Sequence, residues 1–234
     1  KLGAEFEEDT VTAAELGGEV KKIVCENDTY LARAVIIATG AHHRKLGAKG
    51  EEILTGAGVS YCATCDGAFF KGKTTAVIGG GDVAIEDAIF LARMCSKVYL
   101  IHRRDELRGA KSLQNRLMSL DNVEVIWDTV VEEIVGSDKV EALKLNNKKT
   151  GEKSELKVDG VFVAVGIEPD SGQYAGQVET DNQGYIIAGE DGRTSVDGVF
   201  AAGDVRTKAL RQIITAAADG ANCITSAQSY LTRI

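Results

Sequence analysis

The chain has 234 residues, of which 44% are apolar and 26% are charged, and its formal net charge is −8. This composition is typical of a globular protein with one large or two modest cores, and its acidic balance argues against nucleic acid as a partner. No apolar run approaches the ~18 residues of a membrane span, and the N-terminal KLGAEFEED lacks the apolar region of a secretory signal. We therefore expect a cytoplasmic protein that does not bind membranes.

The first third of the chain predicts short strands and a crossover. Residues 20–26 and 30–34 have the pattern of short strands, and the fully apolar run 34–40 (AVIIATG) is typical of a central strand buried on both faces. Residues 41–60 are polar, rich in glycine and without periodicity, so they predict a crossover between domains.

The rest of the chain alternates strands and helices, which predicts an α/β fold. Residues 129–158 have the alternation of an antiparallel hairpin set, and a second glycine-rich crossover follows Pro169. The domain between the two crossovers, residues 46–167, would be inserted into a second domain made of 1–45 and 168–234. The expected strands are 74–78, 98–102, 123–127, 161–165 and 199–203, and the expected helices are 82–95, 110–120 and about 210–230.

A glycine turn between the strand at 74–78 and the following helix has the G-x-G-x-x-A form of a dinucleotide site. Such a site needs a tight turn, a residue without a side chain where the pyrophosphate approaches, and a small residue where helix and strand pack. The pyrophosphate would then meet the helix N-terminus. The alternative is a purely structural turn. The residues assigned to the site are Gly79, Gly81, Asp82, Val83 and Ala84.

The end of the next strand indicates which nicotinamide cofactor is bound. An NAD site usually has an acidic residue there to hold the ribose 2′-hydroxyl. This chain has His102, Arg103 and Arg104, followed by Arg108. Guanidinium groups match the geometry of a phosphate, so the sequence favours NADPH. The alternative is a solvated basic turn that begins a helix.

Cys62-Ala63-Thr64-Cys65 is a C-x-x-C pair, which brings two sulfurs within bonding reach. Asp66 follows at once and is placed to move protons to or from a thiolate. The alternative, half of a zinc site, lacks a second C-x-x-C or C/H pair, and His42 and His43 are distant in sequence. The pattern therefore predicts a redox-active dithiol or disulfide.

Five segments together resemble one family, the low-molecular-weight thioredoxin reductases of bacteria. They are CATCDG at 62–67, GGGDVAIEDA at 79–88, HRRDELR at 102–108, TSVDGVFAAGD at 194–204 and RQIITAAADG at 211–220. The resemblance implies a homodimer with two Rossmann-like nucleotide-binding domains, an NADPH domain inserted into an FAD domain. It implies that electrons pass from NADPH through FAD to the dithiol, and from there to thioredoxin.

The resemblance also implies roles for individual residues. Cys65 would face the flavin, Cys62 would attack the substrate disulfide, and Asp66 would act as general acid and base. The crossovers near 41–50 and 166–172 would be hinges. The FAD-binding residues would be Thr39, Gly40, Gly203, Asp204, Arg211, Gln212 and Ile213.

The chain departs from the family pattern in two respects. No FAD-binding G-x-G-x-x-G precedes residues 34–40, so we expect the sequence to be part of a longer protein, with the FAD domain incomplete at its N-terminus. Asp82 stands where the family often has Asn. Two alternative functions remain: an NADPH-binding module without flavin or turnover, and a flavoprotein reductase for a peroxiredoxin or glutaredoxin-like partner.

Overall fold

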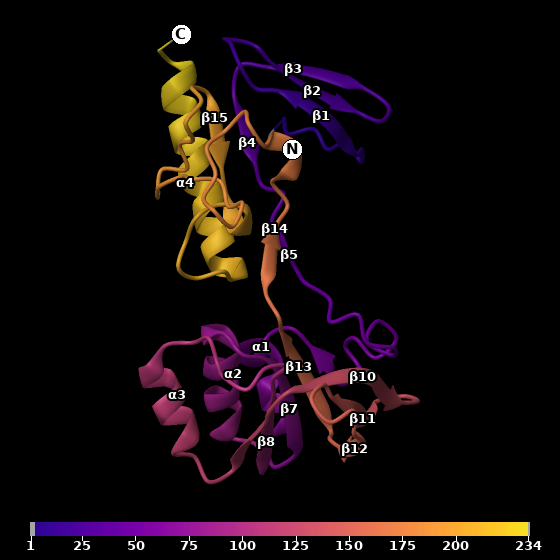
Figure 1. Ribbon diagram of the computed structural model, residues 1–234. Helices are drawn as coiled ribbons and strands as arrows, with labels where there is room; N and C mark the ends of the chain where they lie inside the picture. Colours follow the sequence, from indigo (N-terminus) through magenta and orange to yellow (C-terminus); the bar gives the residue numbers. More distant parts are fainter. Residues whose placement is uncertain (1–2, 234) are drawn as a thin grey trace. The chain divides into compact units, whose positions relative to one another are not determined.

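The computed structural model describes residues 3–233, which form two compact units (Figure 1). The central unit is His43–Gly166. The flanking unit is built from the chain up to His42 and the chain from Ile167 onward.

The central unit is a three-layer structure around a five-stranded parallel sheet (Figure 1). Helices cover one face of this sheet, and a three-stranded antiparallel sheet covers the other. The parallel strands, in spatial order, are β6 (Val59–Ser60), β13 (Gly160–Ala164), β7 (Thr74–Gly79), β8 (Lys97–Ile101) and β9 (Val123–Ile126). The helices are α1 (Ala63–Asp66), η1 (Gly67–Phe70), α2 (Asp82–Ala92) and α3 (Lys111–Met118), and the antiparallel strands are β10 (Thr129–Gly136), β11 (Val140–Asn147) and β12 (Lys153–Lys157).

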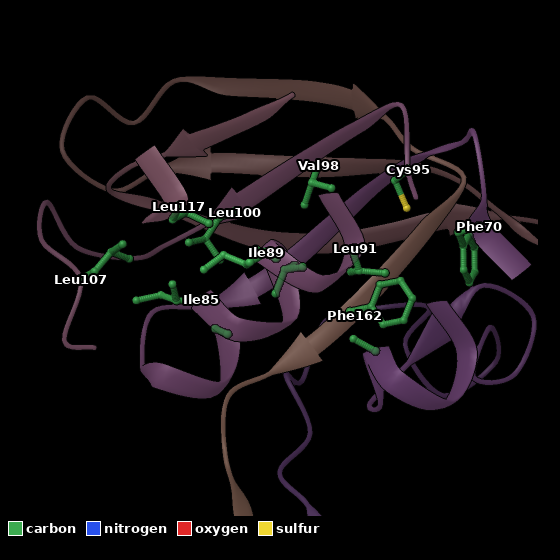
Figure 2. Packing of buried hydrophobic residues seen from close by; sticks show 14 residues of the cluster. Phe70, Ile85, Ile89, Leu91, Cys95, Val98, Leu100, Leu107, Leu117 and Phe162 are labelled. Atoms are coloured by element: carbon green, nitrogen blue, oxygen red, sulfur yellow. The ribbon is translucent and has the colours of Figure 1, made fainter. Parts of the chain in front are cut away.

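Strand β7 shows why the central strands are apolar throughout. Val77 points to the helical side, where it joins a cluster that contains Leu91 of α2 and Phe162 of β13 (Figure 2). Its neighbours Ala76 and Ile78 point to the other side and pack with residues of β10 and β11. A strand that is buried on both faces needs a continuous apolar run rather than an alternating one.

The order of the parallel strands creates a switch point between β7 and β13. The chain proceeds from β7 through α2 to β8 and through α3 to β9, whereas β13 lies on the opposite side of β7. Gly79 and Ala164 are paired at the carboxyl ends of these strands. In open parallel sheets, ligands bind in the crevice at this kind of point.

The flanking unit contains three small sheets and one long helix. β4 and β15 are parallel, and side chains of β15 alternate between two clusters: Phe200 packs with Cys223 and Ala227 of α4, whereas Val199 and Ala201 pack on the opposite side. The bounds are β1 (Val11–Glu15), β2 (Lys21–Cys25), β3 (Thr29–Ala32), β4 (Val35–Ile37), β5 (Ala41–His43), β14 (Ile167–Pro169), η2 (Gly172–Tyr174), β15 (Val199–Ala201), η3 (Gly203–Val205) and α4 (Ile213–Leu231). Strands β1–β3 form an antiparallel sheet, and β5 pairs with β14.

One expectation about the N-terminal third is wrong. The apolar run 34–40 is not a strand buried on both faces, because only Val35–Ile37 is extended and Ile37 alone is fully buried. Within residues 3–233, β4 pairs only with β15, so its other edge receives no cover. The segment 41–60 also contains β5 and β6, whose pairing partners lie more than a hundred residues away.

Candidate functional site

Cys62 and Cys65 form a disulfide at the beginning of α1, directly after β6. Their Cα atoms are 5.3 Å apart. Cys62 is the N-cap residue of α1, and its Sγ accepts a hydrogen bond from the backbone N–H of Cys65 at 3.2 Å. A backbone donor that points at a sulfur favours its thiolate form after reduction. Cys65 is exposed and Cys62 is half-buried, so both sulfurs are open to exchange.

Asp66 is linked to this disulfide through Ser60, a residue that the sequence did not single out. The Ser60 hydroxyl donates to Asp66 Oδ2 at 2.7 Å, and Ser60 Oγ accepts the backbone N–H of Cys62 at 3.1 Å. Ser60 itself is buried at the end of β6. The arrangement holds the Asp66 carboxylate beside the dithiol segment. The only sign of this link in the sequence is a hydroxyl residue two positions before Cys62.

Tyr61, which precedes Cys62, is fixed from two directions. Its hydroxyl donates to the buried carboxylate of Glu51 at 2.8 Å, and its ring stacks on His43 with centroids 5.3 Å apart. Burial, together with the Glu51 carboxylate, raises the pKa of Tyr61 to about 12. His43 thus supports the dithiol segment through stacking. Within residues 3–233, no group of three or more His, Cys, Asp or Glu side chains is placed to hold a metal.

A cleft of about 380 Å³ lies at the carboxyl ends of β7, β8 and β13 in the central unit. Of the predicted NADPH-binding residues, Gly79, His102, Arg103 and Arg108 line it. Arg44 and Lys45 also line it, and the only sign of this in the sequence is a pair of basic residues within a crossover. The other predicted residues lie outside this lining: Gly81, Asp82 and Val83 at the start of α2, Ala84 buried in the core, and Arg104 exposed on the loop after β8.

The three glycines of the turn serve different purposes. A Cβ on Gly79 would lie 2.5 Å from the carbonyl oxygen of Ala164 and 2.6 Å from Ala84 Cβ. The space for a side chain at this position is therefore already filled by β13 and α2. A Cβ on Gly80, which the sequence did not single out, would overlap the ring of His102. A Cβ on Gly81 would meet no atom of the described residues within 4 Å. The open space above the N-cap of α2 fits a pyrophosphate.

His102 shapes the cleft without adding charge at neutral pH. Its ring is buried, and its Nε2 makes no hydrogen bond of good geometry among residues 3–233. Burial lowers the pKa of His102, and the charges of Arg108 and Arg104 lower it further, against the opposing effect of the Gly79 and Glu106 backbone groups. The positive charge of the loop therefore comes from the three arginines.

Asp82 is engaged with the protein itself. Its Oδ1 accepts the backbone N–H of Ala110, the residue before α3, at 2.7 Å. On the same loop, the backbone N–H of Arg108 donates to the carbonyl of Gly80 at 2.7 Å. The turn after β7 and the arginine-bearing loop after β8 are thus held together at two points.

A second cleft, of about 440 Å³, lies in the flanking unit. Gly40, Gly203 and Asp204, three of the predicted FAD-binding residues, line it together with Ala216 and Gly220 of α4. Asp204 Oδ1 is buried and has no hydrogen-bond partner among the described residues. A flavin nucleotide, whose ribityl chain carries hydroxyl donors, would satisfy this acceptor.

The remaining predicted FAD-binding residues do not line this cleft. The Thr39 hydroxyl donates to the carbonyl of Asp170 at 2.6 Å. The Arg211 guanidinium lies over the Tyr185 ring, 3.9 Å from its centroid, and Arg211 Nε is buried without a partner in the described chain. Gln212 is the N-cap of α4 in a capping box with Thr215, and Ile213 is exposed. The unsatisfied Nε of Arg211 is a donor that remains available to a ligand.

A buried ionic cluster fixes the segment that carries Gly203 and Asp204. Asp219 of α4 accepts from Arg206 at 2.6 and 2.9 Å, from Lys208 at 2.7 Å and from the backbone N–H of Gly203 at 2.9 Å. Burial alone would raise the pKa of Asp219, but these donors lower it to about 2. The sequence did not indicate this cluster, since its members are separated by up to 16 residues and match no motif.

The comparisons with known proteins identify the class to which this fold and these sites belong. The profile of the pyridine nucleotide-disulphide oxidoreductase family matches residues 4–220. Thioredoxin reductase of Listeria monocytogenes is 48% identical over 235 residues, which cover 100% of this chain and 74% of that protein. Thioredoxin reductase of Bacillus subtilis is 45% identical, with the same coverage of each chain.

Solved structures give the same result. The thioredoxin reductase of Streptococcus pyogenes superposes with a TM-score of 0.91 at 47% identity, covering 97% of this chain and 74% of that one. That of Giardia duodenalis has a TM-score of 0.91 at 40% identity, covering 98% and 76%. The chain belongs to the pyridine nucleotide-disulphide oxidoreductases and, within them, to the thioredoxin reductase family. The resemblance found in the sequence, the fold class with two Rossmann-like domains, the enzyme class, and the cofactors FAD and NADPH are confirmed.

Proposed function

We propose that this chain reduces the disulfide of thioredoxin with electrons from NADPH, which pass through FAD to the Cys62–Cys65 disulfide. The observation that carries the proposal is this disulfide, linked through Ser60 to the Asp66 carboxylate. It lies in the same unit as a cleft lined by Arg103 and Arg108, which match the phosphate of NADPH. An NADPH-binding module without turnover would have no use for the dithiol.

We assign one nucleotide to each unit. NADPH would bind the central unit, with its pyrophosphate over Gly79–Gly81 and its 2′-phosphate among Arg103, Arg104 and Arg108. FAD would bind the flanking unit, with Asp204 on the ribityl chain. The unsatisfied Asp204 Oδ1 and Arg211 Nε support this assignment. Bound FAD supplies the redox centre that accepts a hydride from NADPH and delivers two electrons to the disulfide. The remaining residues assigned to FAD are Thr39, Gly40, Gly203, Gln212 and Ile213.

The residues of the dithiol segment account for the exchange with thioredoxin. Two electrons and two protons convert the disulfide into a dithiol. Asp66 takes the proton of the Cys62 thiol, and the thiolate attacks one sulfur of the thioredoxin disulfide, so that the other sulfur leaves as a thiolate and receives this proton from Asp66. Cys65 then attacks Cys62, which restores the disulfide and releases the second thioredoxin sulfur as a thiolate that takes up the proton lost by Cys65. The backbone N–H of Cys65 favours Cys62 as the attacking sulfur.

We further propose a cytoplasmic homodimer. The supporting feature is α4, where Ile214 is exposed although large apolar side chains usually avoid water. Among residues 3–233, no helix is long and apolar enough to cross a membrane. Sedimentation of the purified protein at several concentrations tests the dimer.

The exchange of Cys62 or Cys65 for serine tests the proposed function. In the flavin-loaded enzyme, each variant should still bleach the flavin absorbance on addition of NADPH, because hydride transfer does not use the dithiol. Neither variant should reduce thioredoxin, since electrons then have no route from the flavin to the partner. Thioredoxin turnover in either variant at more than a few per cent of the wild-type rate would contradict the assignment.

A further inference from the structure

Lys149 lies on the turn between β11 and β12 and reaches the loop that carries the arginines. The turn is held by its own contacts: the Asn147 side-chain oxygen accepts the backbone N–H groups of Lys149 and Thr150, both at 3.0 Å, and the backbone N–H of Gly151 donates to the Asn147 carbonyl at 2.7 Å. Lys149 Nζ is 2.8 Å from Asp105 Oδ2 and 3.2 Å from Asp128 Oδ2. Asp105 directly follows Arg104 in the sequence.

Asp128 joins the same two segments through its backbone. It adopts a left-handed conformation with φ of 53°, which is uncommon for a residue other than glycine. Its N–H donates to the carbonyl of Arg104 at 3.1 Å, and its carbonyl accepts the N–H of Lys148 at 2.6 Å. The turn, Asp128 and the arginine loop are therefore parts of one hydrogen-bonded arrangement.

The arginine loop and Asp128 together carry equal numbers of cations and carboxylates. Three arginines, at 103, 104 and 108, are accompanied by three carboxylates, those of Asp105, Glu106 and Asp128. The pairing favours the charged form of both partners: hydrogen bonding to Asp105 raises the pKa of Lys149, and hydrogen bonding to Lys149 lowers the pKa of Asp105. Without Lys149, two carboxylates next to the loop would lack their cation and would compete for the neighbouring guanidinium groups.

We propose that Lys149 is a positioning residue that determines cofactor specificity: by holding Asp105 and Asp128, it keeps both carboxylates away from Arg103 and Arg104 and leaves these arginines available for a 2′-phosphate. The proposal rests on the assignment of NADPH to this unit. Because Lys149 and Asp105 are more than half exposed, the effect is modest. Exposed pairs of this kind correspond to changes of about two- to fivefold in an equilibrium constant.

Calorimetric titration with 2′,5′-ADP and with 5′-AMP isolates the 2′-phosphate, since the two nucleotides differ only in this group. In Lys149→Ala, the Kd of 2′,5′-ADP should rise about two- to fivefold, and the Kd of 5′-AMP should stay unchanged. Lys148→Ala is the matched control, because Lys148 has the same charge on the same turn. Its hydrogen bond to Asp128 is made by its backbone N–H, which the substitution keeps. Lys149→Arg should keep the wild-type Kd of 2′,5′-ADP.

Four outcomes test this inference, and the last two distinguish it from the proposed function. Equal weakening of both nucleotides in Lys149→Ala would reveal a merely structural role and overturn the inference. Equal effects of Lys148→Ala and Lys149→Ala on 2′,5′-ADP would overturn it too, because net charge alone would then explain the change. Arg103→Ala tests the site itself. If it leaves the Kd of 2′,5′-ADP unchanged, the NADPH assignment is wrong. If Arg103→Ala raises this Kd and Lys149→Ala does not, only the inference about Lys149 is overturned.

Discussion

Two glycines of one turn illustrate how single residues divide structural and binding roles. Gly79 is required by the protein, because a side chain there would collide with the backbone of Ala164 and with Ala84. Gly81 is in an extended conformation and faces open space, so the protein itself would tolerate a methyl group there. A requirement for glycine at 81 therefore points to a ligand rather than to packing.

Alanine at each position tests this distinction. Gly79→Ala should lower the free energy of unfolding by about 2 kcal/mol, since a carbonyl of a central strand cannot move aside without strain. Gly81→Ala should lower it by less than about 1 kcal/mol, the scale of an N-cap change, while the Kd of ADP rises about tenfold because the methyl group occupies space next to the pyrophosphate. Urea unfolding and calorimetric titration measure both quantities. The reverse pattern, a stable Gly79→Ala or normal binding in Gly81→Ala, would refute this division of roles.

At the scale of elements, Asp219 links α4 to the segment after β15 by an ionic cluster whose effect on stability depends on pH. The pKa of Asp219 in the folded chain is about 2, against 3.8 for an unperturbed Asp. Because the fold favours the charged carboxylate, this charge stabilises the folded chain fully at pH values above the pKa of Asp219 in the unfolded chain. The stabilisation is lost as the pH falls through the lower pKa of the folded chain. The shift corresponds to about 2 kcal/mol at neutral pH, of which about half is lost by pH 3.

Asp219→Asn therefore has a defined pH signature. At pH 7 the variant should unfold at lower urea concentration than the wild type, because Arg206 and Lys208 lose a buried anion. The difference in free energy of unfolding should shrink by about 1 kcal/mol between pH 7 and pH 3, as the wild type loses the contribution of its own carboxylate. Measurement at three pH values suffices. A difference that stays constant with pH would show that the charge of Asp219 is not what stabilises the cluster.

Elements with a strong local pattern were predictable, and those made by distant pairing were not. The strand–turn–helix from Thr74 to Ala92 was predicted because a buried apolar run, a glycine turn and helical periodicity follow one another within a few residues. The four residues of α1 are too few for periodicity. The run 34–40 was misjudged because apolarity alone does not reveal how many strands pair with it.

The same limit applies to the sites. The cysteines, the glycine turn and the arginines stand in compact motifs, so the sequence located the chemistry. Their supports come from other parts of the chain: Glu51 reaches Tyr61 across ten residues, and Lys149 reaches Asp105 across 44. One sequence contains no local pattern for such contacts, since they exist only after the sheet has formed.

At the scale of the whole molecule, each unit has its own hydrophobic cores. Both clusters of the central unit use residues between 46 and 165 only, and both clusters of the flanking unit use residues outside 43–166 only. A unit whose core is complete in itself can unfold as a separate cooperative transition. The chain passes between the units twice, at 42–43 and at 166–167.

We therefore expect two transitions in differential scanning calorimetry. The ligand 2′,5′-ADP should raise the midpoint temperature of the central unit's transition only. A ligand at one hundred times its Kd stabilises the state that binds it by about 2.7 kcal/mol, which for a unit of this size raises the midpoint by about 10 °C. The transition of the flanking unit should stay within about 1 °C. Arg103→Ala is the control, because it should reduce the shift without altering the ligand-free midpoints. A single transition, or an equal shift of both, would show that the two units unfold together, because ligand bound to one unit then stabilises both.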